Sequence, residues 1–222
     1  MEKKKDILDK GAIVQRDGRT YAVTPRIPVG LIKDFDILRR IADVAERYGA
    51  EAIKVTSSQR LTILGIREED IDQVWAELGM SPGMASGLCI RSIKACPGTS
   101  FCRLGQQDAM GLGLRLEERY ANMATPNKLK ISVSGCPLDC AEGRLRDIGL
   151  VGSKKGYTLY VGGCGGASPR IAEPVVRNLD AAEAEQMVDR LVAYYQQSGT
   201  RKRLGDHLAR EGMESLKKAL DL

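Results

Sequence analysis

The chain has 222 residues, of which 43% are hydrophobic and 28% charged; these ordinary globular values exclude a disordered or fibrous protein. No apolar run approaches the about 18 residues of a membrane span. The charged start, residues 1–11, lacks the apolar segment of a secretory signal. The sequence therefore predicts a cytoplasmic protein, in which six cysteines are expected to be metal ligands or catalytic groups rather than disulfides.

The net charge of +5 is modest, but the acidic residues are unevenly distributed. Five of the six cysteines fall in windows without Asp or Glu, which cover residues 18–33, 52–67, 81–107, 123–138 and 151–172. Such windows indicate a positively charged surface that faces an anionic ligand. The alternative is that strands and glycine-rich loops are generally poor in acids, and the composition leaves both explanations open.

The first part of the chain has the pattern of half a split βαβ sandwich, with the order β-α-β-β-α from residue 20 to 79. Apolar spacing and turn residues predict a short helix over 2–10, a hairpin over 12–27 and a helix over 34–49. Two strands over 52–66 and a further helix over 67–79 are expected to follow. Gly11 and Gly49 are expected to end the first two helices.

The second part begins after the glycine-rich segment 81–87, the best candidate for a domain boundary. The pattern of this part predicts a strand over 87–96, a helix over 103–121 and a second strand over 128–135. A hairpin over 148–163 and a glycine loop over 162–170 are expected to follow, and two helices over 180–197 and 204–220 to end the chain. The whole chain is therefore expected to be α+β in two layered parts.

Four cysteines form two pairs, Cys96 and Cys102 in CPGTSFC and Cys136 and Cys140 in CPLDC, each directly after a predicted strand. Loops after strands can meet at one sheet edge, where four thiolates suit tetrahedral zinc or an iron–sulfur cluster. Neither spacing is the short C-x2-C knuckle typical of zinc, so a cluster is favoured. A core role for these thiols is disfavoured, because Gly, Pro and Ser surround them.

The other reactive side chains carry weaker signals. Cys89 lies in an apolar strand-like run and is expected in the core, whereas Cys164 in GGCGG is either structural or part of a pocket. His207, the only histidine, is predicted to lie at the surface rather than to ligate a metal. The basic run 200–203 is expected to be a solvated helix entry, with little specificity for nucleic acid.

Taken in order, these motifs resemble the sirohaem and [4Fe–4S] sulfite and nitrite reductases. The resemblance covers roughly residues 12–175 and includes TPRIPVG, KVTSSQRLTILGI, both cysteine pairs, KLKISVSG and GGCGGASPR. With one copy of the arrangement, the chain is most similar to the small single-repeat assimilatory-type enzymes of anaerobes. The resemblance implies a ferredoxin-like half-domain over 1–80 and, over 81–222, an α/β domain with C-terminal helices that binds sirohaem and the cluster.

The resemblance also implies roles for individual residues. The four paired cysteines would hold the cluster, with Cys140 also bridging to the sirohaem iron. Arg26, Lys128 and Lys130 would bind sulfite; the two lysines, two apart in a predicted strand, would point the same way, although a solvated surface pair is the alternative. Further sirohaem contacts are expected from Lys54, Arg60, Arg91, Gly163, Gly165 and Arg170.

The chain departs from the family pattern at two places. Ser58 stands where larger members have a substrate-binding arginine, and Arg60 or Lys54, expected on the same face of the strand, would replace that cation. Leu138 and Asp139 stand in the second cysteine pair, where family members often carry asparagine.

Three functions follow from the resemblance. The first is six-electron reduction of sulfite to sulfide with electrons from an external low-potential donor such as a ferredoxin, because no flavin or nicotinamide motif is present. The second is reduction of nitrite to ammonia on the same centres. The third is a non-catalytic electron-transfer or sirohaem-binding protein, suggested by Ser58. No nucleic-acid or membrane partner is expected.

Overall fold

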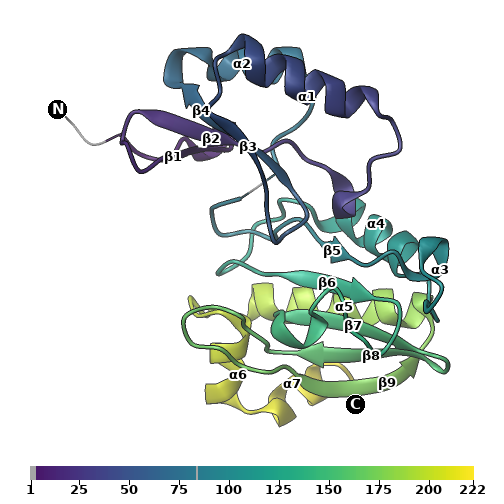
Figure 1. Cartoon of the computed structure of the whole chain (residues 1–222). Helices are drawn as coiled ribbons and strands as arrows, with labels where there is room; N and C mark the ends of the chain where they lie inside the picture. Colours follow the sequence, from purple (N-terminus) through teal and green to yellow (C-terminus); the bar gives the residue numbers. More distant parts are fainter. Residues whose placement is uncertain (1–3, 84) are drawn as a thin grey trace. The chain divides into compact units, whose positions relative to one another are not determined.

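The computed structural model describes residues 4–83 and 85–222 and divides into two compact units, Met1–Gly87 and Leu88–Leu222 (Figure 1). The division falls at the end of the glycine-rich segment 81–87, seven residues after the predicted limit at residue 80. Each unit has its own sheet.

Unit 1 is an antiparallel four-stranded sheet in the order β1-β2-β4-β3, with α1 and α2 on one face (Figure 1). Its main elements are β1 Ala12–Val14, β2 Thr20–Val23, α1 Asp36–Arg47, β3 Ala52–Val55, β4 Leu61–Arg67 and α2 Ile71–Leu78. Helix α1 buries Ile41, Val44 and Ala45, which lie three and four residues apart and so share one helix face. The predicted β-α-β-β-α order is therefore confirmed.

The predicted helix over 2–10 is wrong for the described residues, because only a single 3₁₀ turn, η1 Leu8–Lys10, forms there. Ile7 pairs with Ala12 through two backbone hydrogen bonds, so the chain already reverses direction at this point. Gly11 ends the turn in a left-handed conformation (φ 58°), as expected of a glycine stop. Residues 2 and 3 lie outside the described residues.

The segment KVTSSQRLTI is a hairpin rather than one strand, and this corrects the expected alignment of its side chains. Ser58 lies in the turn between β3 and β4, where Thr56 and Arg60 exchange hydrogen bonds. The period-2 argument that put Ser58 and Arg60 on one face therefore fails. Lys54 lies exposed on β3, an edge strand of the unit, whereas Arg60 is buried directly before β4.

Unit 2 contains a five-stranded sheet in the order β5-β6-β7-β8-β9, parallel from β5 to β7 and antiparallel beyond. Its strands are β5 Lys94–Ala95, β6 Ile131–Ser134, β7 Ile148–Ser153, β8 Gly156–Val161 and β9 Glu173–Leu179. Its helices are α3 Gly98–Phe101, α4 Ala109–Tyr120, η4 Gly143–Leu145, α5 Ala181–Gln197, α6 Leu204–Glu211 and α7 Met213–Ala219. Helix α4 packs on β5 and β6, α5 packs on β8 and β9, and the two helices contact each other.

Several elements of unit 2 differ from the prediction. The run 87–96 forms only β5 and isolated bridges, since its backbone pairs mainly with loops. The predicted last helix is two, broken at Gly212 (φ 83°). Strand β9 was missed, and the helix expected near 103–121 starts only at Ala109, capped by the Asp108 carboxylate.

His207 is buried rather than exposed, contrary to the prediction. It lies on α6, and a hydrogen bond of 3.2 Å joins its Nε2 to the Tyr194 hydroxyl on α5. The side chain therefore helps to pack the two helices. Among the described residues, no helix has the length and apolar character needed to cross a membrane.

Candidate functional site

The two cysteine loops meet at one edge of the unit 2 sheet. Cys96 directly follows β5, Cys136 lies two residues after β6, and these strands are parallel neighbours. The Cys96 N–H donates to the Val133 carbonyl (3.1 Å), and the Gly135 N–H donates to the Cys96 Sγ (3.1 Å). The two loops therefore adjoin at this end of the sheet, because parallel strands end side by side.

The four cysteines differ in exposure. Cys96 and Cys136 are buried, whereas Cys102 and Cys140 are exposed, and all four are free. Within residues 4–83 and 85–222, no three His, Cys, Asp or Glu side chains gather closely enough to hold one metal ion. A cubane cluster instead takes one thiolate at each of four irons, so its ligands stand further apart than those of a single zinc.

Glycines let the two loops pack backbone against backbone. A Cβ on Gly135 would lie 2.7 Å from both the Gln107 carbonyl oxygen and the Gly98 Cα. A Cβ on Gly105 would lie 2.5 Å from the Gly98 carbonyl. Together with four thiols on two adjoining loops, this close packing fits a [4Fe–4S] cluster, whose four ligands must be held in fixed positions.

Lys128 and Lys130 lie just before β6 and not within it, which corrects the predicted strand over 128–135. Leu129 between them is fully buried and bridges to Ile90, while Lys128 is exposed and Lys130 half-buried. The alternation of an extended chain is therefore kept. The four residues of β6 separate this end from the cysteine loops by roughly 13 Å, so a ligand that meets both must extend along the sheet.

The surroundings of Lys130 are strongly basic. Burial lowers the pKa of Lys130, and repulsion from the nearby cations Arg146, Arg203 and Lys128 lowers this pKa further. Arg146 is itself buried, and its Nε has no hydrogen-bond partner among the described residues. An anion placed here would relieve this repulsion.

A buried ion pair organises this end of the sheet. Arg203 donates to both Asp147 carboxylate oxygens (3.2 Å from Nε and 2.6 Å from Nη2), and the Lys130 N–H donates to Oδ2 (2.9 Å). Burial raises the pKa of Asp147, and the pairing with Arg203 opposes that rise. The prediction that the basic run 200–203 is solvated is therefore wrong for Arg203, which turns inward to Asp147.

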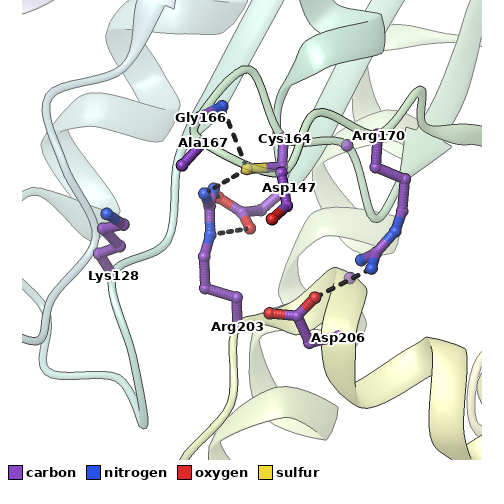
Figure 2. Close-up of a pocket in the computed structure, with 11 residues that line it drawn as sticks. Lys128, Asp147, Cys164, Gly166, Ala167, Arg170, Arg203 and Asp206 are labelled. Atoms are coloured by element: carbon purple, nitrogen blue, oxygen red, sulfur yellow. Dashed lines mark hydrogen bonds and ion pairs between the residues drawn. The ribbon is translucent and has the colours of Figure 1, made fainter.

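A pocket of about 240 Å³ opens beside this pair (Figure 2). The Arg203 Nη1 donates to the Cys164 Sγ (2.7 Å), and the Arg170 Nη2 donates to Asp206 (2.9 Å). Lys128 also lines the pocket, on the side away from Arg170 in Figure 2. Of the two roles left open for Cys164, the structure favours the pocket thiol.

The remaining predicted residues lie in different surroundings. Arg26 is half-buried in the extended segment after β2 of unit 1, and its N–H donates to the Ser81 carbonyl (2.9 Å). Arg91 of unit 2 is buried, which lowers its pKa. Gly163 and Gly165 flank Cys164, and a Cβ on Gly163 would lie 2.6 Å from the Arg146 carbonyl oxygen.

Sequence reasoning missed Arg146, Asp147 and Arg203. The local signals are the run RLRD before β7 for Arg146 and Asp147 and the basic run 200–203 for Arg203, and neither indicates a buried charge. The ion pair joins positions 56 residues apart in sequence, so no local pattern could have revealed it.

Two family models match the chain: the nitrite and sulphite reductase 4Fe–4S domain over residues 86–222 and the nitrite/sulfite reductase ferredoxin-like half domain over residues 13–81. The chain belongs to the nitrite and sulphite reductase family. It is thus an oxidoreductase, and the cofactors of the family are a [4Fe–4S] cluster and sirohaem.

Individual relatives agree with this family. The chain is 42% identical over 212 residues to an assimilatory-type sulfite reductase of Nitratidesulfovibrio vulgaris, which covers 95% of this chain and 97% of the relative. A Bacillus subtilis NAD(P)H nitrite reductase is 37% identical over 211 residues, but the chain spans only 26% of that protein.

Solved structures share the fold. Dissimilatory sulfite reductase I matches 91% of this chain and 69% of its own with a TM-score of 0.83 and 15% identity. The NirA protein of Mycobacterium tuberculosis matches 91% of this chain and 40% of its own with a TM-score of 0.81 and 18% identity. The family fold predicted from sequence is therefore confirmed.

Replacing Cys89 by alanine should leave the iron and acid-labile sulfide content of the protein unchanged. Cys89 is 4% exposed and bridges to Ala124, so it is expected to fill space in the core. Iron and sulfide analysis of the purified variant tests this. A loss of cluster iron would mean that the four ligands include Cys89.

Proposed function

We propose that this chain is an assimilatory-type sulfite reductase that reduces sulfite to sulfide by six electrons. The observation that carries the proposal is the pair of cysteine loops at the adjoining ends of β5 and β6, in a unit whose other sheet end is lined by cations. The near-complete coverage of the Nitratidesulfovibrio vulgaris relative supports sulfite as the substrate.

In this proposal Cys96, Cys102, Cys136 and Cys140 would hold the cluster, and Cys140 would also be the ligand shared with sirohaem. When bound, the cluster and sirohaem would supply the electrons that reduce the anion. The exposure of Cys140 suits the bridging role, because a bridging thiolate must be open to a second group. The buried Cys96 and Cys136 would hold the cluster from the inner side of the loops.

We assign Arg26, Lys128 and Lys130 to the sulfite anion. Charged donors bind an oxyanion more strongly than neutral ones do. The lowered pKa of Lys130 makes its Nζ a better proton donor than an ordinary lysine, and the reduction consumes protons. Lys54, Arg60, Arg91, Arg170 and the backbone at Gly163 and Gly165 would serve the sirohaem carboxylates, for which arginine forks are suited.

The external electron donor, proposed to be a small low-potential protein such as a ferredoxin, and the cytoplasmic location complete the proposal. Nitrite is the second candidate substrate, because several relatives are nitrite reductases. The chain spans only about a quarter or less of the length of the nitrite reductases from Bacillus subtilis and Klebsiella oxytoca.

The decisive experiment combines spectroscopy with assay. The purified holoprotein should show the Soret and red-region bands of sirohaem, and reduced viologen should drive sulfide formation from sulfite faster than ammonia formation from nitrite. Faster nitrite turnover would make nitrite the substrate. A sirohaem spectrum without turnover of either anion would favour the non-catalytic function. Failure of the protein to bind sirohaem when the cofactor is supplied would overturn the proposal.

A further inference from the structure

Asp139 lies inside the second cysteine pair, directly before Cys140, in a left-handed backbone conformation (φ 55°). Residues other than glycine rarely adopt this conformation unless local hydrogen bonds compensate, and Asp and Asn tolerate it best. The side chain is only 9% exposed although it carries a carboxylate. Both facts require that the surrounding structure holds Asp139 in place.

The Asp139 carboxylate accepts hydrogen bonds at both oxygens. Oδ1 accepts from the Ser134 hydroxyl (2.8 Å) and the Gly143 N–H (2.7 Å). Oδ2 accepts from the Arg144 N–H (3.0 Å) and from its guanidinium (3.3 Å). The carboxylate thus joins the last residue of β6 to the start of η4, and the cysteine lies between these two points in the chain.

Ser134 holds the other side of Cys140 as well. Its hydroxyl accepts the Ala141 N–H (3.0 Å) while it donates to Asp139. Cys140 is therefore flanked by two residues that are bound to the same hydroxyl group. Because Ser134 is fully buried at the end of β6, its hydrogen bonds tie the backbone around the exposed Cys140 to the sheet.

We propose that Asp139, with Ser134, is a positioning residue that fixes the direction in which Cys140 presents its thiolate to the cluster. The inference rests on the proposed function for the presence of the cluster. The carboxylate accepts from Ser134, Gly143 and Arg144 and so acts through the chain on each side of Cys140. This role accounts for an acidic residue beside a thiolate ligand, a placement that is otherwise unfavourable for two anions.

The test uses the full chain loaded with its cluster and compares Asp139→Ala, Asp139→Asn and Ser134→Ala with the parent protein. The rate at which a ferrous-iron chelator removes the cluster should rise about 10-fold to 100-fold in Asp139→Ala, the range typical for lost outer-shell partners. Asp139→Asn keeps an acceptor for Ser134 and Gly143 and should recover part of the loss. The reduced cluster of Asp139→Ala should also give an altered electron paramagnetic resonance spectrum.

Asp180→Ala is the matched control. Asp180 is likewise an aspartate that accepts a backbone N–H, from Glu183 at 2.8 Å, but it caps α5. Chelator kinetics and spectra of this variant should equal those of the parent. Equal behaviour of Asp139→Ala and Asp180→Ala would overturn the inference; if Asp139→Ala fails to fold, parent-like chelator kinetics and spectra in both Asp139→Asn and Ser134→Ala would do so.

The outcomes for the two proposals are separable. A parent protein that holds a cluster but no sirohaem would overturn the proposed function, while the chelator comparison, which needs only the cluster, still decides the role of Asp139. A parent protein that takes up no cluster under reconstitution would overturn both.

Discussion

Replacing Cys140 by serine is expected to lower the rate of sulfite reduction about 100-fold or more. This loss is larger than that expected when a residue that only supports a metal ligand is removed. The serine hydroxyl is a poor replacement for a thiolate at iron, and the change removes one cluster ligand and the proposed bridge to sirohaem together. The measurements are turnover with reduced viologen and the spectroscopic coupling between haem and cluster.

Cys102→Ser is the matched comparison for this variant. Cys102 is also exposed and also proposed to bind the cluster, but it has no bridging role. It should damage the cluster while the haem that remains keeps the axial ligand of the parent. A normal spectrum and normal turnover in Cys140→Ser would show that another residue bridges the centres.

The double variant Lys128→Met/Lys130→Met should lose about 100-fold or more in kcat/KM for sulfite, because each charge-assisted contact contributes about 1.5–3 kcal/mol. Methionine keeps most of the length and the apolar stem, so the packing around buried Leu129 and the sirohaem spectrum should survive. Steady-state kinetics with sulfite and absorption spectra of the purified variant are the measurements.

The pH profile gives a second readout of the same variant. Binding of the anion needs protonated Lys130, whose folded-state pKa lies below the usual 10.5 because of burial and neighbouring cations. In the parent protein, activity should therefore fall as the pH rises through this lowered pKa, earlier than an ordinary lysine would allow. The double variant should lack that alkaline limb.

The control is Lys154→Met/Lys155→Met, which removes two exposed lysines at the turn between β7 and β8 and so matches the change in net charge. It should keep parent-like kinetics. Unchanged kinetics in the Lys128/Lys130 variant would identify that pair as solvated and shift the anion site towards Arg26 and Arg60. Loss of sirohaem would instead show that the pair serves the cofactor carboxylates.

The sequence by itself determined the β-α-β-β-α order of unit 1 and indicated the cofactor chemistry of the cysteines. The stripe of Ile41, Val44 and Ala45 specified α1, because helical periodicity is contained in a dozen residues. The two cysteine pairs after predicted strands likewise indicated a cluster, since a strand followed by a glycine-containing loop is a local pattern. These features depend on neighbours in the chain, and local pattern is sufficient to recognise them.

Only the tertiary structure decided which charged groups are buried and what they meet. Arg203 was expected in solvent but pairs with Asp147, which lies 56 residues away, and Asp139 was noted only as a departure but accepts four hydrogen bonds. It also placed Lys128 and Lys130 before β6 and the cysteines after it. A buried charge is stable only with partners, and those partners come from distant segments that sequence periodicity does not connect.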